Sequence, residues 1–288
     1  MAEQMQDIKR RIKSIGSTER ITNAMKLVSA AKLRRAKAVY EHSRMFLNRI
    51  IESIDEAYDN GASVPEDYLL GSREIKTTCY VVITSSTGLC GSFNGNIIRE
   101  VEEEIKATDS RPVLVTIGSK GREHFVRQSV EVLFPHDESA DSLQFQDIKA
   151  LTEPLIEKYH NKEIDEIRLV YTSYINTLKQ EPVSRRILPV DMNEHQSSAQ
   201  TSMAMMEYEP SADAVFDYLA SKYLELALYS AAIESSTCEH AARRQAMENA
   251  SDNASDMLSA LQLKYNRARQ SQITDEIIEI VSGSEAQA

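Results

Sequence analysis

The fold is decided by residues 211–282, which read SADAVFDYLASKYLELALYSAAIESSTCEHAARRQAMENASDNASDMLSALQLKYNRARQSQITDEIIEIVS and contain neither glycine nor proline. Residues 17–60 form a second stretch that lacks both. Proline in a helix interior costs about 3 kcal/mol and glycine about 1 kcal/mol, so both stretches permit very long helices. All seven prolines and seven of the nine glycines lie within 61–210. We therefore predict a long helix, a middle segment rich in helix breakers, and a second long helix.

Both breaker-free stretches carry apolar or small residues at alternating spacings of four and three, which is typical of a two-stranded coiled coil. A single helix over 72 residues would extend about 108 Å, too long for a globular core to bury. Because the middle segment joins the two helices, we expect them to pair antiparallel. The alternative is shorter helices, broken near 207–210 or 251–253. The first series is Ile8, Ile12, Ile15, Glu19, Thr22, Lys26, Ser29, Leu33, Ala36, Tyr40, Ser43, Leu47, Ile50, Ile54 and Ala57; the second is Val215, Leu219, Leu226, Tyr229 and Ile233, a weaker stretch at His240 and Arg243, then Met247, Ala250, Ala254, Leu258, Leu261, Tyr265 and Ala268.

The middle segment alternates predicted strands and helices. Such alternation favours a mostly parallel sheet with helices on both faces, a Rossmann-like arrangement. The fold class is thus α/β with long helices: residues 1–60 form the N-terminal coiled-coil helix, 61–210 the α/β domain and 211–288 the C-terminal coiled-coil helix. Strands are expected at 78–84, 113–117, 130–134, 166–175 and 184–190, the last one antiparallel, and helices at 96–107, 121–128 and 145–159.

The last turns of the second helix are apolar. Ile273, Ile277 and Ile280 form one stripe, and Ile278 and Val281 widen it beyond one face. A chain terminus normally frays and is polar, so an apolar end indicates a partner that surrounds it. The alternative is that this end packs against the start of the first helix, which would cover one side.

A glycine-rich loop follows the first predicted strand, where phosphate-binding loops lie in nucleotide-binding folds. Gly88, Gly91 and Gly95 have neither the G-x-G-x-x-G spacing nor the lysine of a Walker loop. A tight structural turn is the favoured interpretation. Cys90 lies in the loop without a flanking histidine or acid, and we expect no catalytic, cofactor-binding or metal-binding residues.

Composition and charge limit the classes of protein further. The chain is 42% hydrophobic and 27% charged, has no apolar run that would span a membrane and no secretory signal at its start. Three widely spaced cysteines argue against a disulfide framework and favour a reducing compartment. Residues 1–49 hold 12 Lys and Arg against 4 Asp and Glu, although the whole chain has a net charge of −11. This basic helix either meets an anionic partner, with nucleic acid the weakest option, or is a solvated face neutralised by the acidic second helix.

Four motifs in order resemble the gamma subunit of F-type ATP synthases. The likeness covers the whole chain and departs at Ser284, where the family usually has alanine. The motifs are Ile21-Thr-Asn-Ala-Met25-Lys-Leu-Val-Ser-Ala-Ala-Lys-Leu-Arg34; Gly88-Leu-Cys-Gly91 with Asn94; Ala241-Ala-Arg243-x-x-Ala246-Met247-x-x-Ala250-Ser-Asp252-Asn253; and Tyr265-Asn-Arg-Ala-Arg269-Gln270-x-x-Ile273-Thr274-x-Glu276.

The resemblance implies a non-catalytic rotor subunit without cofactors. Its terminal helices would form the central stalk inside a ring of three alpha and three beta subunits, and its Rossmann-like domain would meet the epsilon subunit and the c-subunit ring. The complex would lie at the cytoplasmic face of a bacterial cell membrane. The resemblance implies that Met25, Arg269, Gln270 and Thr274 contact beta subunits, and that Met206, Glu207 and Tyr208 lie at the contact with epsilon and the c-ring.

Two other functions stay open from the residues alone. One is a nucleotide-dependent Rossmann-like enzyme with helical dimerisation arms, and the other is a static coiled-coil scaffold. The resemblance implies that the coupling ion, H⁺ or Na⁺, is set by the c subunits.

Overall fold

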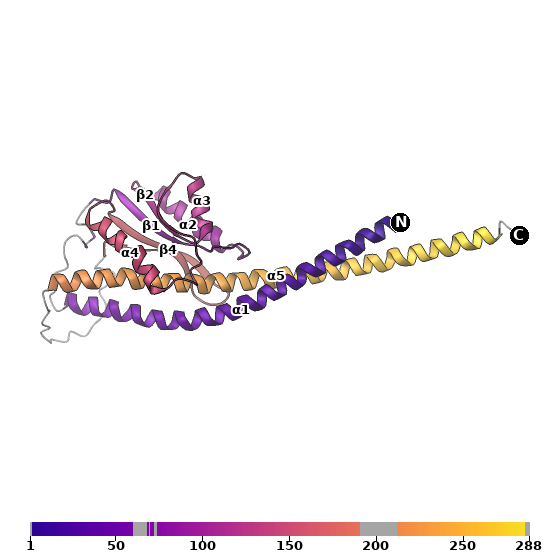
Figure 1. Cartoon of the computed structure of the whole chain (residues 1–288), viewed down its shortest axis with the longest axis horizontal. Coiled ribbons are helices and arrows are strands. Elements are labelled where there is room, and N and C mark those ends of the chain that lie inside the picture. The colour runs from indigo at the N-terminus through magenta and orange to yellow at the C-terminus, as the bar shows by residue number, and fades with distance from the viewer. Residues whose placement is uncertain (1, 60–67, 69, 72–73, 191–211, 286–288) are drawn as a thin grey trace. The chain divides into compact units, whose positions relative to one another are not determined.

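The chain was analysed as a computed structural model that describes residues 2–59, 68, 70–71, 74–190 and 212–285 (Figure 1). Its two long helices are α1, Ala2–Asp59, and α5, Ala212–Glu285. Helix α5 is continuous through 251–253, so the predicted alternative of a break there is wrong, and 207–210 lie outside the described residues. The chain divides into two compact units, one made of 1–30 with 243–288 and the other of 31–242.

The first unit consists of the beginning of α1 and the second half of α5. Arg11 and Ile15 of α1 line the same small pocket as Met257 and Leu261 of α5. The two helices run in opposite directions (Figure 1). A Cβ at Gly16 would lie 3.9 Å from Leu258 Cδ2, which is ordinary van der Waals contact. The heptad positions in this unit are half-buried or buried, whereas most positions between them are exposed. The predicted antiparallel coiled coil is confirmed in this unit.

The second unit contains a five-stranded sheet of order β3-β2-β1-β4-β5. Strand β1 pairs in parallel with β2 and β4, and β2 pairs in parallel with β3. Strand β5 pairs antiparallel with β4 at the edge, where Pro182 faces Thr172. Proline is tolerated at a sheet edge, which explains why β5 begins four residues before the predicted start. The strands are β1 Thr77–Ile83, β2 Arg111–Ile117, β3 Glu131–His136, β4 Glu166–Tyr174 and β5 Gln180–Leu188.

Helices cover both faces of this sheet (Figure 1). On one face, Tyr80, Val82 and Leu114 pack with helices α2, Phe93–Ala107, and α3, Ser119–Arg127. On the other face, the sheet packs against α4, Phe145–His160, together with α1 and α5. The predicted α/β fold with a mostly parallel sheet is confirmed.

Helix α5 is enclosed where it crosses the second unit. Every residue from 230 to 241 is buried, including the polar side chains of Ser235, Thr237 and His240. A helix buried on all sides is usually apolar throughout, whereas this one is built largely from Ala, Ser, Thr and Cys. Small side chains let the neighbouring backbones approach closely, so α5 forms the middle of this unit.

Candidate functional site

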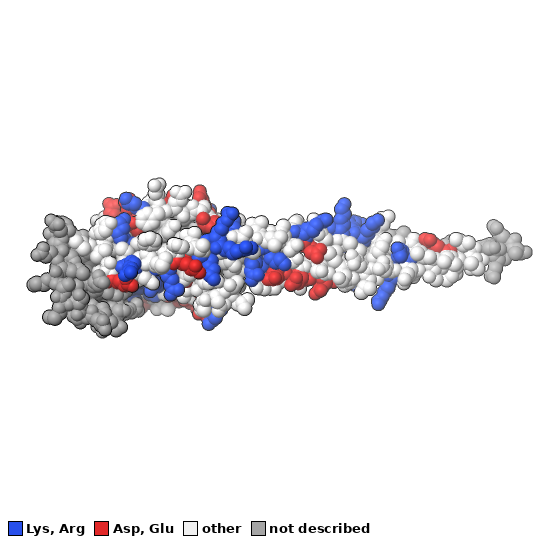
Figure 2. Space-filling view, turned by 90° about the horizontal axis from the view of Figure 1, so that it is seen from below, with Lys and Arg blue, Asp and Glu red and all other residues white. Residues whose placement is uncertain are grey.

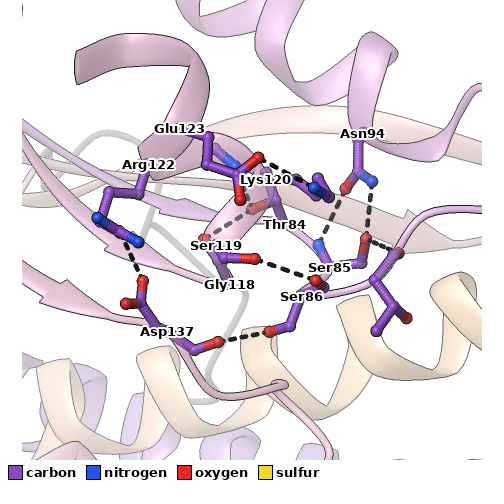
Figure 3. A network of polar contacts seen from close by, with 12 residues as sticks. Thr84, Ser85, Ser86, Asn94, Gly118, Ser119, Lys120, Arg122, Glu123 and Asp137 are labelled. Carbon is purple, nitrogen blue, oxygen red and sulfur yellow. Dashed lines mark hydrogen bonds and ion pairs between the residues drawn. The ribbon is translucent and has the colours of Figure 1, made fainter. Parts of the chain in front are cut away.

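The carboxyl ends of β1 and β2 form the place where a nucleotide-binding domain would hold phosphate. Figure 3 shows that the polar groups there bond to one another. The Ser85 amide donates to Asn94 Oδ1 at 2.9 Å, and Asn94 Nδ2 donates to Ser85 Oγ at 2.7 Å. Ser86 Oγ donates to the Asp137 carbonyl at 2.7 Å. The loop is thus fixed by internal hydrogen bonds.

The beginning of α3 is also occupied by contacts with β1. The Gly121 amide donates to Thr84 Oγ1 at 2.9 Å, and the Lys120 amide donates to the Ser85 carbonyl at 3.2 Å (Figure 3). A Cβ at Gly118 would collide with the Thr84 carbonyl oxygen. These hydrogen bonds hold the end of β1 against the beginning of α3. They support a structural role for the glycine-rich loop.

Helix α5 fills the crevice at the point where the strand order reverses. This point lies between β1 and β4, and it is where ligands bind in open α/β sheets. Cys238 of α5 is fully buried there, and its thiol donates to the Thr172 carbonyl at 3.4 Å. The same side chain packs in a cluster with Cys90 and Phe93 of the loop and α2. The crevice thus holds protein side chains in place of a ligand.

The three cysteines belong to the hydrophobic core of the second unit. Cys79, Cys90 and Cys238 are free and buried. Burial raises the pKa of the Cys79 thiol to about 12 and raises the pKa of Cys238 as well, so both thiols stay protonated at neutral pH. Within the described ranges, no group of three His, Cys, Asp or Glu side chains is placed to hold a metal ion.

The predicted beta-subunit contacts lie in the first unit. Met25 is half-buried on α1, and Arg269, Gln270 and Thr274 are exposed on α5. Thr274 Oγ1 donates to the Gln270 carbonyl at 3.0 Å, which places these two residues one turn apart. Arg269 makes no ion pair with any residue that the structure describes. The predicted residues Met206, Glu207 and Tyr208 lie outside the described residues.

The apolar end of α5 is uncovered. Ile273 is 47% exposed, and the exposed fractions of Ile277, Ile278, Val281 and Ile280 range from 53% to 71%. The alternative that this end packs against Ile8 and Ile12 is therefore wrong for the isolated chain.

The described part of α1 in the second unit has a basic outer surface. Residues 31–49 hold six Lys and Arg but a single Glu, and all six basic residues are exposed. Figure 2 shows Lys and Arg side chains on the face seen from below, with acidic side chains beside them in places. Of these six, Lys32 and Arg49 form ion pairs with described carboxylates. The surface is thus suited to an acidic partner.

Two carboxylates join α5 to its surroundings in the second unit. Glu234 accepts from the Ser173 hydroxyl and the Tyr174 amide of β4, both at 2.8 Å. Asp141, in the segment before α4, lies 2.8 Å from Lys32 Nζ of α1 and 3.4 Å from His240 Nε2 of α5. The sequence analysis missed both carboxylates, although the polar His240 at a seam position was a signal that a partner was needed.

Comparisons with known proteins decide between the interpretations. A family model described as ATP synthase matches residues 4–287. The ATP synthase gamma chain of Alkaliphilus metalliredigens is 41% identical over 285 residues, with 98% of each chain covered. The chain belongs to the family of ATP synthase gamma chains. The sodium-ion-specific gamma chain of Acetobacterium woodii is 36% identical, with 99% of each chain covered.

Solved structures agree with this fold. A chain of the Euglena gracilis mitochondrial ATP synthase aligns with a TM-score of 0.71 at 18% identity, covering 100% of this chain and 95% of that one. A chain of the Tetrahymena thermophila mitochondrial ATP synthase, from its central stalk and c-ring, aligns with a TM-score of 0.60 at 24% identity, covering 80% of this chain and 99% of that one.

The prediction of a gamma subunit is confirmed by its relatives, which favour it over the enzyme and the scaffold. As a gamma chain, it is a non-catalytic subunit of the synthase. None of the described helices combines the length and the apolar character needed to cross a membrane.

Proposed function

We propose that this chain is the central-stalk rotor of an F-type ATP synthase, which transmits torque between an ion-driven c-ring and a catalytic ring of three alpha and three beta subunits. The observation that carries the proposal is the uncovered apolar end of α5 on an antiparallel helix pair. Isoleucines that are about half exposed or more are costly in water, at roughly 25 cal/mol for each Å² of apolar surface. A sleeve formed by the alpha and beta subunits would cover all sides of this end and still let it turn.

In this proposal, the remaining residues have roles along the stalk. Met25, Arg269, Gln270 and Thr274 contact the beta subunits. The basic surface of α1 faces acidic groups of the ring, since opposite charges steer such contacts. The α/β domain is the foot of the stalk, and Met206, Glu207 and Tyr208 contact epsilon and the c-ring. The complex lies at the cytoplasmic face of a bacterial cell membrane.

Direct observation of rotation tests the proposal. Val126 on α3 is 53% exposed and the native cysteines are buried, so a Val126→Cys chain can be labelled at one site. The chain is reconstituted with alpha and beta subunits from the same cell, the ring is fixed to a surface, and a bead is attached at position 126. ATP should turn the bead in one direction with three pauses per revolution. A bead that stays still while the complex hydrolyses ATP would overturn the proposal.

A double variant tests whether the ring covers the apolar end of α5. Ile277→Gln with Ile280→Gln should leave thermal unfolding of the isolated chain unchanged, because both side chains are already exposed. The same variant should assemble with the ring less tightly. Undiminished assembly would show that the ring does not cover this end.

A further inference from the structure

Glu234 connects α5 to the sheet of the second unit. It accepts hydrogen bonds from the Ser173 hydroxyl and the Tyr174 amide of β4. Burial, followed by the charge of Glu234, raises the pKa of the Tyr40 hydroxyl of α1. The Tyr40 and Tyr174 rings meet edge to face, with centroids 6.2 Å apart. The Glu234 side chain is buried, so these donors replace the water that its charge would otherwise bind. One carboxylate thus joins α5 to strand β4.

Asp141 makes the reciprocal connection from the α/β domain to the helices. Its Oδ2 atom lies 2.8 Å from Lys32 Nζ and 3.4 Å from His240 Nε2, and His240 is only 3% exposed. The hydrogen bond from the His240 ring and the nearby Lys32 ammonium hold the pKa of Asp141 well below its usual range. The carboxylate therefore stays ionised, and both contacts persist at physiological pH.

The two connections reach α5 from different directions. Glu234 and His240 are six residues apart, which corresponds to about 9 Å along the helix and a difference in direction of about 120°. A single attachment would let a helix pivot about it. Two attachments in different directions resist both rotation of α5 about its axis and sliding along it.

The apolar contacts of α5 with the core lie before these attachments in the helix. The side chains that make them are Tyr223, Leu224, Ala227, Leu228, Ala231 and Ala232. Dispersion contacts between apolar side chains are non-directional. Hydrogen bonds to charged groups are directional and roughly twice as strong as neutral ones. The polar connections thus add directional resistance to the rotation of α5.

We propose that Glu234 and Asp141 are the positioning residues that lock α5 to the α/β domain and transmit torque between them. This inference rests on the proposed rotor function. The two proposals can be disproved separately. Rotation of the wild-type complex tests the rotor function, whereas the angular stiffness of the variants tests the role of Glu234 and Asp141.

The test measures angular stiffness in the reconstituted complex with the bead at Val126→Cys. In a complex stalled without nucleotide, the variance of the bead angle reports the compliance between the ring and α3. Two attachments in parallel share the load, so the loss of one moves the variance toward a doubling. Glu234→Ala and Asp141→Ala should each increase the variance. Glu234→Gln keeps an oxygen that accepts from Ser173 and Tyr174, and it should return the variance close to the wild-type value.

Coupling gives a second readout in sealed vesicles that contain the whole synthase. The alanine variants should pump fewer ions per ATP against an opposing gradient, whereas ATP hydrolysis without a gradient stays near wild type. Asp109→Ala is the matched control, because Asp109 is an exposed carboxylate of the same domain with no partner among the described residues. Wild-type variance and coupling in both alanine variants would overturn the proposal. If Glu234→Ala fails to fold, Asp141→Ala in the exposed segment decides the outcome.

Discussion

Gly118 allows close approach between the end of β1 and the beginning of α3. Its φ of +90° lies in the region that favours glycine, and a Cβ there would collide with the Thr84 carbonyl oxygen. We expect Gly118→Ala to lower the free energy of unfolding by about 2–4 kcal/mol, because backbone strain and a clash with main-chain atoms act together. Urea unfolding followed by circular dichroism measures this loss.

Gly95 provides the control for this substitution. It lies inside α2, and a Cβ there would meet nothing within 4 Å. Gly95→Ala should be neutral or stabilise the chain by up to ~1 kcal/mol through helix propensity. Equal losses in both variants would contradict the assigned role of Gly118.

Tyr171 makes the stability of the second unit depend on pH in the alkaline range. Burial, followed by the charge of Glu234, raises the pKa of its hydroxyl to about 12. The folded chain therefore holds this proton more tightly than the unfolded chain, so stability is complete below about pH 10 and is lost as the pH rises toward 12. The loss from this group is on the order of 2 kcal/mol. Tyr171→Phe should flatten the fall in stability between these pH values, as measured by urea midpoints. An unchanged slope would show that Tyr171 ionises equally in both states.

The middle of α5 is packed within the core of the second unit. Ala232 is 1% exposed there, so Ala232→Leu forces extra methylene groups into a packed region. We expect a loss of about 1–3 kcal/mol in the free energy of unfolding. Ala38→Leu adds the same atoms to an exposed position of α1 in the same unit and should be neutral. Thermal melts of the two variants make the comparison, and equal melting temperatures would contradict the packing argument.

An element could be predicted from the sequence where the residues that determine it lie within the same stretch of chain. The heptad series predicted the buried positions of α1 because one repeating partner covers one face of the helix. The strands were predicted within a few residues, since each alternates with a helix and ends at a turn. The complete burial of 230–241 was missed, because Ser, Thr and Glu look solvated until a sheet and a second helix enclose them. The partners of Asp141 and Glu234 come from segments far apart in the chain, so no local pattern indicates them.

At the scale of the whole molecule, α5 changes its environment along its length. Its side chains are buried from 230 to 241, whereas every described residue from 273 to 282 is exposed. Local stability follows such burial, so the end of α5 should open most readily in the isolated chain. A partner that binds this end stabilises it by mass action, which couples the order of the helix to assembly.

The exposed residues near this end are therefore the place to separate folding from function. Arg269→Ala with Gln270→Ala removes two exposed side chains, so thermal unfolding of the isolated chain should stay unchanged. In the reconstituted complex, ATP hydrolysis should fall roughly tenfold or more, since a hydrogen bond to a charged group contributes about 1.5–3 kcal/mol. Gln262→Ala removes an exposed side chain of the same helix outside the proposed contact and should leave turnover unaffected. If the double variant hydrolyses ATP at the wild-type rate, Arg269 and Gln270 do not contact the beta subunits in a way that matters for catalysis, and the contact must lie elsewhere on α5.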